Sequence, residues 1–170
     1  MEHYKSWAGL NKQLHETLCD SLKDKIRYFL TRYHEVHNAY GRAAILLDGK
    51  ELVCFSWIEM YRQDSDLAET YDRGTGPSYE DATVLLKPKW DADCTYCEMD
   101  FLNAALQFRS LAIRDALESE NYIIKMLAIM DKRVGQRTLS KIAADEVYLQ
   151  YPEWVRQFYE LRLAQKCYKS

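Results

Sequence analysis

The fold is decided by the stretch Arg42-Ala-Ala-Ile-Leu-Leu-Asp48-Gly49-Lys50-Glu-Leu-Val-Cys-Phe-Ser-Trp-Ile58, in which two apolar runs flank an Asp-Gly pair. Both central residues of a type I′ turn need a positive φ, and Asp-Gly adopts that conformation at low cost. We therefore predict a tight hairpin at Asp48-Gly49. Its strands should run over Arg42–Leu47 and from Glu51 to about Ile58.

Residues upstream of the hairpin extend this sheet and add a helix. From Lys25 to Tyr33 the sequence alternates, with Ile26, Tyr28 and Leu30 on one face, which is typical of a half-buried strand. Before it, apolar residues recur at helical spacing from the plausible N-cap Ser6 to about Cys19; they are Trp7, Leu10, Leu14 and Leu18. The first sixty residues thus predict one helix followed by a three-stranded antiparallel meander.

The middle of the chain is less regular. Glu59–Ala68 could prolong the last strand or form a short helix, and the composition of residues 73–78 indicates a loop. Ala82–Leu86 could form a fourth, edge strand that ends before Pro88.

Helical periodicity begins at Glu98 and continues to the C-terminus. We expect about four helices, with a break in the first apolar stripe near Ser110 and a last helix opened by Pro152. Their apolar sets are Leu102, Ala105, Leu106, Ile113, Ala116 and Leu117; Ile123, Met126, Leu127 and Met130; Leu139, Ile142, Ala143 and Val147; and Trp154, Val155, Phe158 and Leu161. Strands first and helices afterwards predict an α+β fold, with an N-terminal helix, a three- to four-stranded antiparallel meander and then these helices.

Length and composition predict one globular domain over 1–170. The chain has 170 residues, 48% of them hydrophobic, and a net charge of −3. We divide it into the helix and meander at about 6–58, an acidic irregular segment at 59–100 and a helical half at 98–168. The chain has no run of roughly 18 apolar residues, and its start lacks the order of a signal peptide. We therefore expect a cytoplasmic protein, and its nearly balanced charge argues against a surface devoted to nucleic-acid phosphates.

Charge is unevenly distributed along the chain. Residues 59–100 carry four Lys/Arg and eleven Asp/Glu, whereas residues 119–170 carry nine and six. A solvated face is the plain interpretation of the acidic segment. The sharper one is a patch that attracts a basic partner, with tyrosines as anchors. Its candidate residues are Glu59, Tyr61, Asp64, Asp66, Glu69, Tyr71, Asp72, Tyr79, Glu80 and Asp81.

A second constellation lies between two predicted helices, at Asp131 to Arg137. Gly135 fits a helix C-cap, where a left-handed backbone is favourable without a Cβ. Arg133 and Arg137 could bind a carboxylate such as Asp131 in bidentate fashion and hold two helices together. A structural turn with an ion pair is the expectation here, and contact with an anion or a nucleic acid is the alternative.

The cysteines are candidates for metal binding. Cys94 and Cys97 have a ligand-like spacing, and His34 and His37 form a similarly spaced pair far upstream. The five cysteines of the chain, an odd number without a signal peptide, are expected to be reduced thiols. Two distant pairs, one of them in an acidic segment, make a weak metal site, so we expect no metal and no cofactor.

No catalytic template fits. His34-Glu35-Val36-His37 is one residue short of the zincin spacing, and Gly74-Thr75-Gly76 lacks the Lys-Ser/Thr of a phosphate loop. The Gly-x-Ser-x-Gly elbow of the hydrolases is also missing from the sequence.

Several motifs occur together along the chain: Trp7-x-x-Leu10, Leu18-Cys19, Tyr28, Thr31-Arg32-Tyr33, Gly41-Arg42, Asp48-Gly49-Lys50-Glu51, the run from Ala128 to Leu139, and Phe158-Tyr159-x-x-Arg162. Together they resemble a family of uncharacterised small bacterial proteins of about this length. The resemblance covers nearly the whole chain except the acidic middle. It implies a bacterial, cytosolic single domain and supplies no activity or catalytic residue. Cys94 and Cys97 do not belong to the pattern, which further weakens the metal hypothesis.

Three functional hypotheses remain. The first is a non-catalytic protein that binds another macromolecule, most plausibly a basic protein, in an immunity-like or regulatory role. The second is an enzyme of unrecognised type with a pocket between the meander and the helices. The third is nucleic-acid binding through the basic C-terminal helices.

Overall fold

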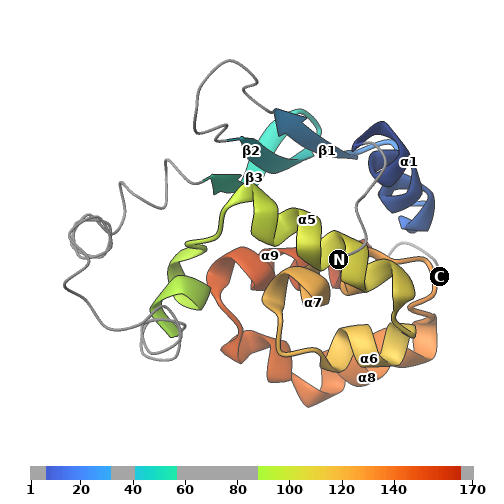
Figure 1. The fold of residues 1–170 in the computed structure, drawn as a ribbon. Helices are drawn as coiled ribbons and strands as arrows, with labels where there is room; N and C mark the ends of the chain where they lie inside the picture. Colours follow the sequence, from blue (N-terminus) through green and yellow to red (C-terminus); the bar gives the residue numbers. More distant parts are fainter. Residues whose placement is uncertain (1–6, 32–40, 57–87, 166–170) are drawn as a thin grey trace.

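The structure is a computed structural model that describes residues 7–31, 41–56 and 88–165 (Figure 1). In these residues a helix comes first, three strands follow and the rest is mainly helical, so the predicted α+β class is confirmed. The elements are α1 (Trp7–Thr17), β1 (Ile26–Thr31), β2 (Arg42–Leu47), β3 (Lys50–Ser56), α5 (Glu98–Ser110), α6 (Ile113–Glu118), α7 (Tyr122–Met130), α8 (Gln136–Asp145), the 3₁₀ helix η1 (Val147–Gln150) and α9 (Glu153–Ala164).

The three strands form an antiparallel sheet in the order β1-β2-β3. Tyr28 pairs with Ile45, and Ile45 pairs with Val53. Asp48 and Gly49 have φ angles of 50° and 82°, as a type I′ turn requires, so the predicted hairpin is confirmed. The register shifts between Ile45 and Leu46, which is the sign of a bulge.

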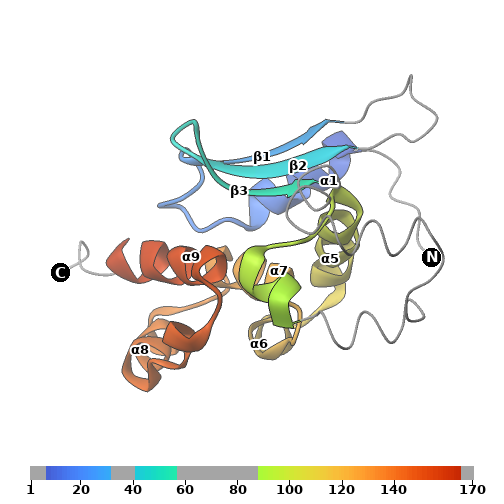
Figure 2. The same cartoon turned by 90° about the vertical axis from the view of Figure 1, so that its left-hand side faces the viewer.

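The molecule has two layers, with the sheet lying over the helices (Figure 2). Side chains that alternate along the strands turn one face of the sheet toward α1 and α5. These inward residues are Ile26, Tyr28, Ala43, Ile45, Val53 and Phe55, all buried. Phe101 of α5 stacks on Phe55, with ring centroids 5.2 Å apart. The predicted inward face of β1 is thereby confirmed for Ile26 and Tyr28.

Helix α7 lies at the centre of the helical layer, in contact with α5, α6 and α9. Seven of its nine residues are buried, as expected for a helix that is apolar on every side. Its N-cap is Asn121, whose Oδ1 accepts hydrogen bonds from the backbone N–H groups of Ile123 (2.9 Å) and Ile124 (3.3 Å). The predicted break near Ser110 is confirmed, because α5 ends there and α6 begins at Ile113.

Two backbone hydrogen bonds join the end of α1 to the end of α7. The N–H of Cys19 donates to the carbonyl of Met130 at 2.9 Å, and the N–H of Lys132 donates to that of Thr17 at 2.8 Å. Leu18 and Asp131 therefore form a short antiparallel bridge between the two halves of the chain. We call this pairing the α1–α7 bridge.

Three local predictions were wrong or shifted. Gly135 is the N-cap of α8 with a φ of −78°, not a helix C-cap, because α7 ends at Met130 with Asp131 as its C-cap. Val147 lies outside α8, since Glu146 turns left-handed (φ 53°) and ends the helix. Pro152 is the N-cap of α9 and precedes its first turn.

The predicted features of the middle segment, namely Glu59–Ala68, residues 73–78 and the strand Ala82–Leu86, lie outside the described residues. Across 7–31, 41–56 and 88–165, no helix is long and apolar enough to cross a bilayer.

Candidate functional site

The predicted acidic patch lies outside the part of the chain that the structure describes. This applies to Glu59, Tyr61, Asp64, Asp66, Glu69, Tyr71, Asp72, Tyr79, Glu80 and Asp81, and equally to His34 and His37. Their roles therefore stay predictions, and the site is built below from the described residues.

The turn after α7 contains an ion pair between Arg133 and the fully buried Asp131. The Arg133 Nη2 lies 2.8 Å from Oδ2 of Asp131, and its Nε lies 3.1 Å from each carboxylate oxygen. The backbone N–H of Arg133 also donates to Oδ1 at 2.7 Å. Nη1 reaches the carbonyl of Leu111 at 3.3 Å, and the guanidinium lies 5.6 Å from the ring centre of Phe108. Arg133 therefore connects this turn to the corner between α5 and α6.

Beside this turn, a cleft of about 490 Å³ opens between α6, α8, η1 and α9. We call it the helical cleft. Apolar and aromatic side chains form much of its wall: Ile113, Leu117, Val134, Ile142, Val147, Tyr148, Tyr151 and Tyr159. Charged side chains complete the lining: Arg114, Glu118, Arg133, Arg137, Lys141 and Asp145.

Tyrosines at the cleft pack on one another and hold its wall in place. The rings of Tyr148 and Tyr159 are parallel within 8°, with centroids 5.7 Å apart, and Tyr151 meets Tyr159 edge-on at 5.3 Å. Burial, with a contribution from Tyr151, raises the pKa of Tyr159 far above its usual range. The hydroxyl of Tyr159 is therefore neutral at physiological pH and serves the packing rather than acid–base chemistry.

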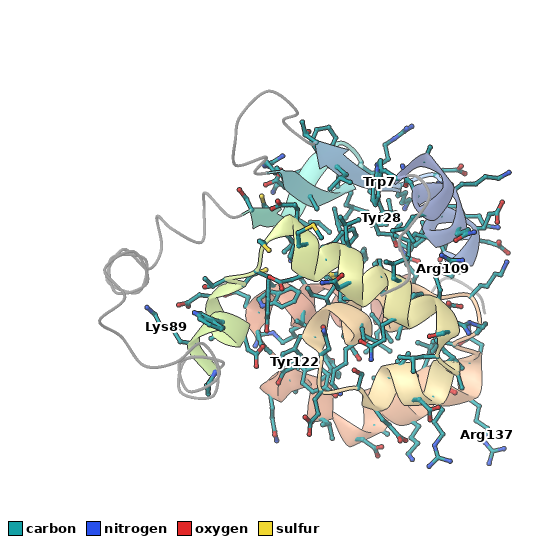
Figure 3. All side chains as sticks on the ribbon, viewed as in Figure 1. Trp7, Tyr28, Lys89, Arg109, Tyr122 and Arg137 are labelled. Carbon is teal, nitrogen blue, oxygen red and sulfur yellow. The ribbon has the colours of Figure 1, made fainter. Side chains whose placement is uncertain are left out.

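The charges that line the cleft are not all paired. Arg114 Nε lies 3.1 Å from Glu118 Oε1, and Arg133 binds Asp131. No described carboxylate, by contrast, forms an ion pair with Arg137 or Lys141, which are both exposed. These two residues are four apart on α8, so they lie on the same face of that helix. Figure 3 shows Arg137 projecting outward from the helical layer.

Arg137 was predicted to join Arg133 in a structural ion pair. The structure instead places it in the lining of the helical cleft, exposed and without an ion-pair partner in the described ranges. Arg137 is exposed and lies in the first turn of α8, which begins after the N-cap Gly135.

A second hollow lies between the sheet and the helices, beside strand β3. It comprises two adjoining spaces of about 340 and 380 Å³, lined by β3, by residues 92–96 and by the start of α9. In this hollow Gln157 Nε2 donates to the carbonyl of Leu52 at 3.1 Å, and Trp154 Nε1 donates to that of Asp91 at 2.6 Å. We call this the strand-edge hollow, and it occupies the place where an enzyme pocket was hypothesised.

Cys94 and Cys97, the pair with ligand-like spacing, lie in two different environments. Cys97 is the N-cap of α5; its N–H donates to Asp100 Oδ2 at 2.8 Å, and burial raises the pKa of its thiol to about 12. Burial, with a further contribution from Cys54, also raises the pKa of the Cys94 thiol, well above its usual range. Within the described ranges, no three His, Cys, Asp or Glu side chains gather as metal ligands would.

Sequence reasoning missed the helical cleft, although two signals pointed to it. Arg137 and Lys141 have the i,i+4 spacing of one helical face, and the tyrosines at 148, 151 and 159 cluster in a segment otherwise rich in charge. The missing information was the position of α6, which closes the cleft from a distant part of the chain.

Fold and site together define an α+β protein whose helical half carries a cleft with apolar walls and cations at its opening. The chain belongs to the SF0329 protein family, which it matches over residues 6–163 and whose function is not established. No curated protein and no solved structure matches the chain.

Proposed function

We propose that this protein is a non-catalytic binding protein that takes an acidic, partly apolar segment of another protein in the helical cleft. The observation that carries the proposal is the combination of an apolar wall with Arg137 and Lys141, two cations without an ion-pair partner in the described chain.

The apolar wall supports a ligand that buries hydrophobic side chains. Val147 is 52% exposed and lines the cleft together with the tyrosine cluster, so the apolar wall is accessible to a ligand. A volume of about 490 Å³ accommodates a few side chains of a peptide, as in grooves that bind amphipathic segments. The stack of Tyr148 on Tyr159 resembles the aromatic surfaces on which binding energy concentrates in protein interfaces.

The cations that line the cleft support an acidic partner. Arg137 and Lys141 lie on one face of α8 and would attract carboxylates placed beside apolar anchors. A nucleic acid fits less well, because much of the cleft wall is apolar and offers no contact to a phosphate backbone. Arg114 and Arg133 are already paired, so few cations are left to release counterions from a nucleic-acid backbone.

A second candidate function is supported by the acidic segment. Residues 59–100 carry eleven acidic and four basic side chains, which favours association with a basic protein in an immunity-like or regulatory role. This candidate rests on the sequence, and it predicts a partner of opposite charge to that of the helical cleft.

Selection of random displayed peptides on the full-length protein tests both candidates. A consensus rich in Asp and Glu with apolar anchors supports the helical cleft, and the double variant Arg137→Glu/Lys141→Glu should weaken these peptides by about tenfold or more. Val147→Asp should weaken them as well, by making the apolar wall polar. The matched control Arg109→Glu/Lys50→Glu makes the same charge change at exposed positions outside the cleft and should alter affinity less than about twofold.

The alternative outcomes are distinct. A basic consensus that the cleft variants leave unchanged would overturn the cleft proposal and favour the acidic segment. Tighter binding of a DNA or RNA oligonucleotide than of any acidic peptide, lost in the same double variant, would favour the nucleic-acid hypothesis instead.

A further inference from the structure

The strand-edge hollow brings together two cysteines that are 40 residues apart in sequence. Cys54 lies on β3 and Cys94 follows the helical stretch 88–93. The Sγ of Cys94 is 3.9 Å from the carbonyl oxygen of Cys54, and both residues line the same space. Both are in the thiol form. The fold thus places Cys94 beside Cys54, whereas the sequence spacing had pointed to Cys97.

The backbone at Cys94 is held in an uncommon conformation. Its φ of 55° lies in the left-handed region, which a residue with a Cβ adopts at a cost of about 1 kcal/mol or more. This conformation accompanies the approach of its sulfur to β3, and backbone strain of this kind tends to occur at functional positions.

A cation lies beside the Cys54 sulfur. Arg42 is on β2, the neighbouring strand, and it lines the same hollow. Burial alone would lower the pKa of Arg42, but its hydrogen bond to Glu51 and its interactions with the Cys54 sulfur raise that pKa overall. A guanidinium next to a sulfur supplies the positive charge that stabilises a thiolate.

We propose that Cys54 and Cys94 form a peroxide-sensitive dithiol, in which Cys54 is the sulfur that is oxidised first and Cys94 is the resolving cysteine. The ligand class of this site is a small hydroperoxide, which can enter the open hollow beside β3.

The chemistry proceeds in two balanced steps. The Cys54 thiolate attacks one oxygen of hydrogen peroxide, the O–O bond breaks, and the products are a sulfenic acid on Cys54 and hydroxide. The Cys94 sulfur then attacks the sulfenic sulfur, the S–O bond breaks, and the departing hydroxyl leaves as water with the proton of the Cys94 thiol. In total, two thiols and one peroxide give one disulfide and two waters. A thiol reductant such as dithiothreitol returns both cysteines to the starting state.

The surroundings of Cys54 and Cys94 decide which sulfur reacts with peroxide first. Burial keeps the Cys94 thiol protonated, because it raises the pKa of that group well above its usual range. Cys94 therefore makes a poor first nucleophile for peroxide, and it acts only after the sulfenic acid has formed beside it. Cys97 is the matched control: it is three residues from Cys94 and buried, and it is not among the described residues that line the strand-edge hollow.

The experiment treats the full-length protein with hydrogen peroxide, blocks remaining thiols and digests the protein without reduction. Mass spectrometry should detect a peptide pair joined by Cys54–Cys94 that disappears after dithiothreitol. Cys54→Ser should abolish this linkage, and Cys94→Ser should leave a sulfenic acid at position 54 that dimedone traps. Cys97→Ser should form the linkage at the wild-type rate. Arg42→Gln should slow it several-fold, and Arg42→Lys should restore much of the rate.

The overturning results are equally specific. A Cys94–Cys97 linkage as the main product, or dimedone labelling at Cys94 rather than Cys54, would refute the proposed pair or its roles. Oxidation that proceeds at the same rate in Arg42→Gln would refute the role of the cation. None of the substituted residues lines the helical cleft, so this outcome does not depend on the function proposed above.

Discussion

Replacing Arg133 by alanine should destabilise the fold, because it leaves the buried carboxylate of Asp131 without its cation. The side chain of Asp131 is 0% exposed, and Arg133 contacts it through Nε and Nη2 at 2.8–3.1 Å. Removing one partner of a buried ion pair costs about 3–5 kcal/mol. Two features reduce this cost: the Arg133 side chain is 41% exposed, and the backbone N–H at position 133 still donates to the carboxylate. We therefore expect a loss of about 2–3 kcal/mol.

Thermal and urea denaturation at neutral pH, followed by circular dichroism, measure this loss. For a chain of this length, about 2–3 kcal/mol corresponds to a fall in Tm of about 4–12 °C. The matched control is Arg137→Ala, which removes an exposed arginine without an ion-pair partner in the described chain and should stay within about 0.5 kcal/mol of wild type.

A double-variant cycle tests the cause. Asp131→Asn keeps an oxygen that can accept the backbone N–H of residue 133 but removes the buried charge. The double variant Asp131→Asn/Arg133→Ala should therefore be less destabilised than the sum of the single variants, by about 1 kcal/mol or more. An Arg133→Ala variant as stable as Arg137→Ala, or strictly additive effects in the cycle, would refute the reasoning.

Three further predictions concern stability. Gly41→Ala should lower the free energy of unfolding, measured by urea denaturation, by about 1–3 kcal/mol, since its Cβ would lie 2.6 Å from the carbonyl oxygen of Thr31. Gly135→Ala is the control: nothing lies within 4 Å of its Cβ, so it should cost less than about 1 kcal/mol. Asn121→Ala should lower the free energy of unfolding by about 1 kcal/mol through loss of the α7 cap, and Asn121→Asp should retain most of it. Burial raises the pKa values of Tyr28 and Tyr159, so the unfolded chain loses these protons first as pH rises. Stability should accordingly be complete below pH about 10 and fall above it, and a urea midpoint that does not change between pH 8 and 11 would contradict this.

The hairpin and the helices could be predicted from the sequence because their signals are local. Asp48-Gly49 specifies its turn through the φ angles of two residues, and the apolar stripe of α7 is a property of nine consecutive positions. Gly135 was misassigned because a glycine suits either end of a helix. The end of α7 depends on the pairing of Leu18 with Asp131, a contact that no local pattern contains.

The candidate sites were harder to predict because they also depend on contacts between segments that are distant in sequence. The helical cleft needs α6 on one side and α8 with η1 on the other, and the strand-edge hollow joins β3 to residues 92–96. Spacing alone selected Cys97 as the companion of Cys94, because two cysteines three residues apart are visible in the sequence. The approach of Cys94 to Cys54 depends on tertiary structure over 40 residues.

The α1–α7 bridge also constrains how the chain can fold while it is being synthesised. Thr17 and Cys19 leave the ribosome early, but their partners Lys132 and Met130 follow roughly 110 residues later, which takes about 5–20 s at ordinary elongation rates. During this interval Leu14, Leu18 and Leu22, all buried in the finished protein, have no helical layer to cover them. We therefore expect a holdase chaperone to bind this chain most strongly during synthesis, before the residues of α7 have left the ribosome.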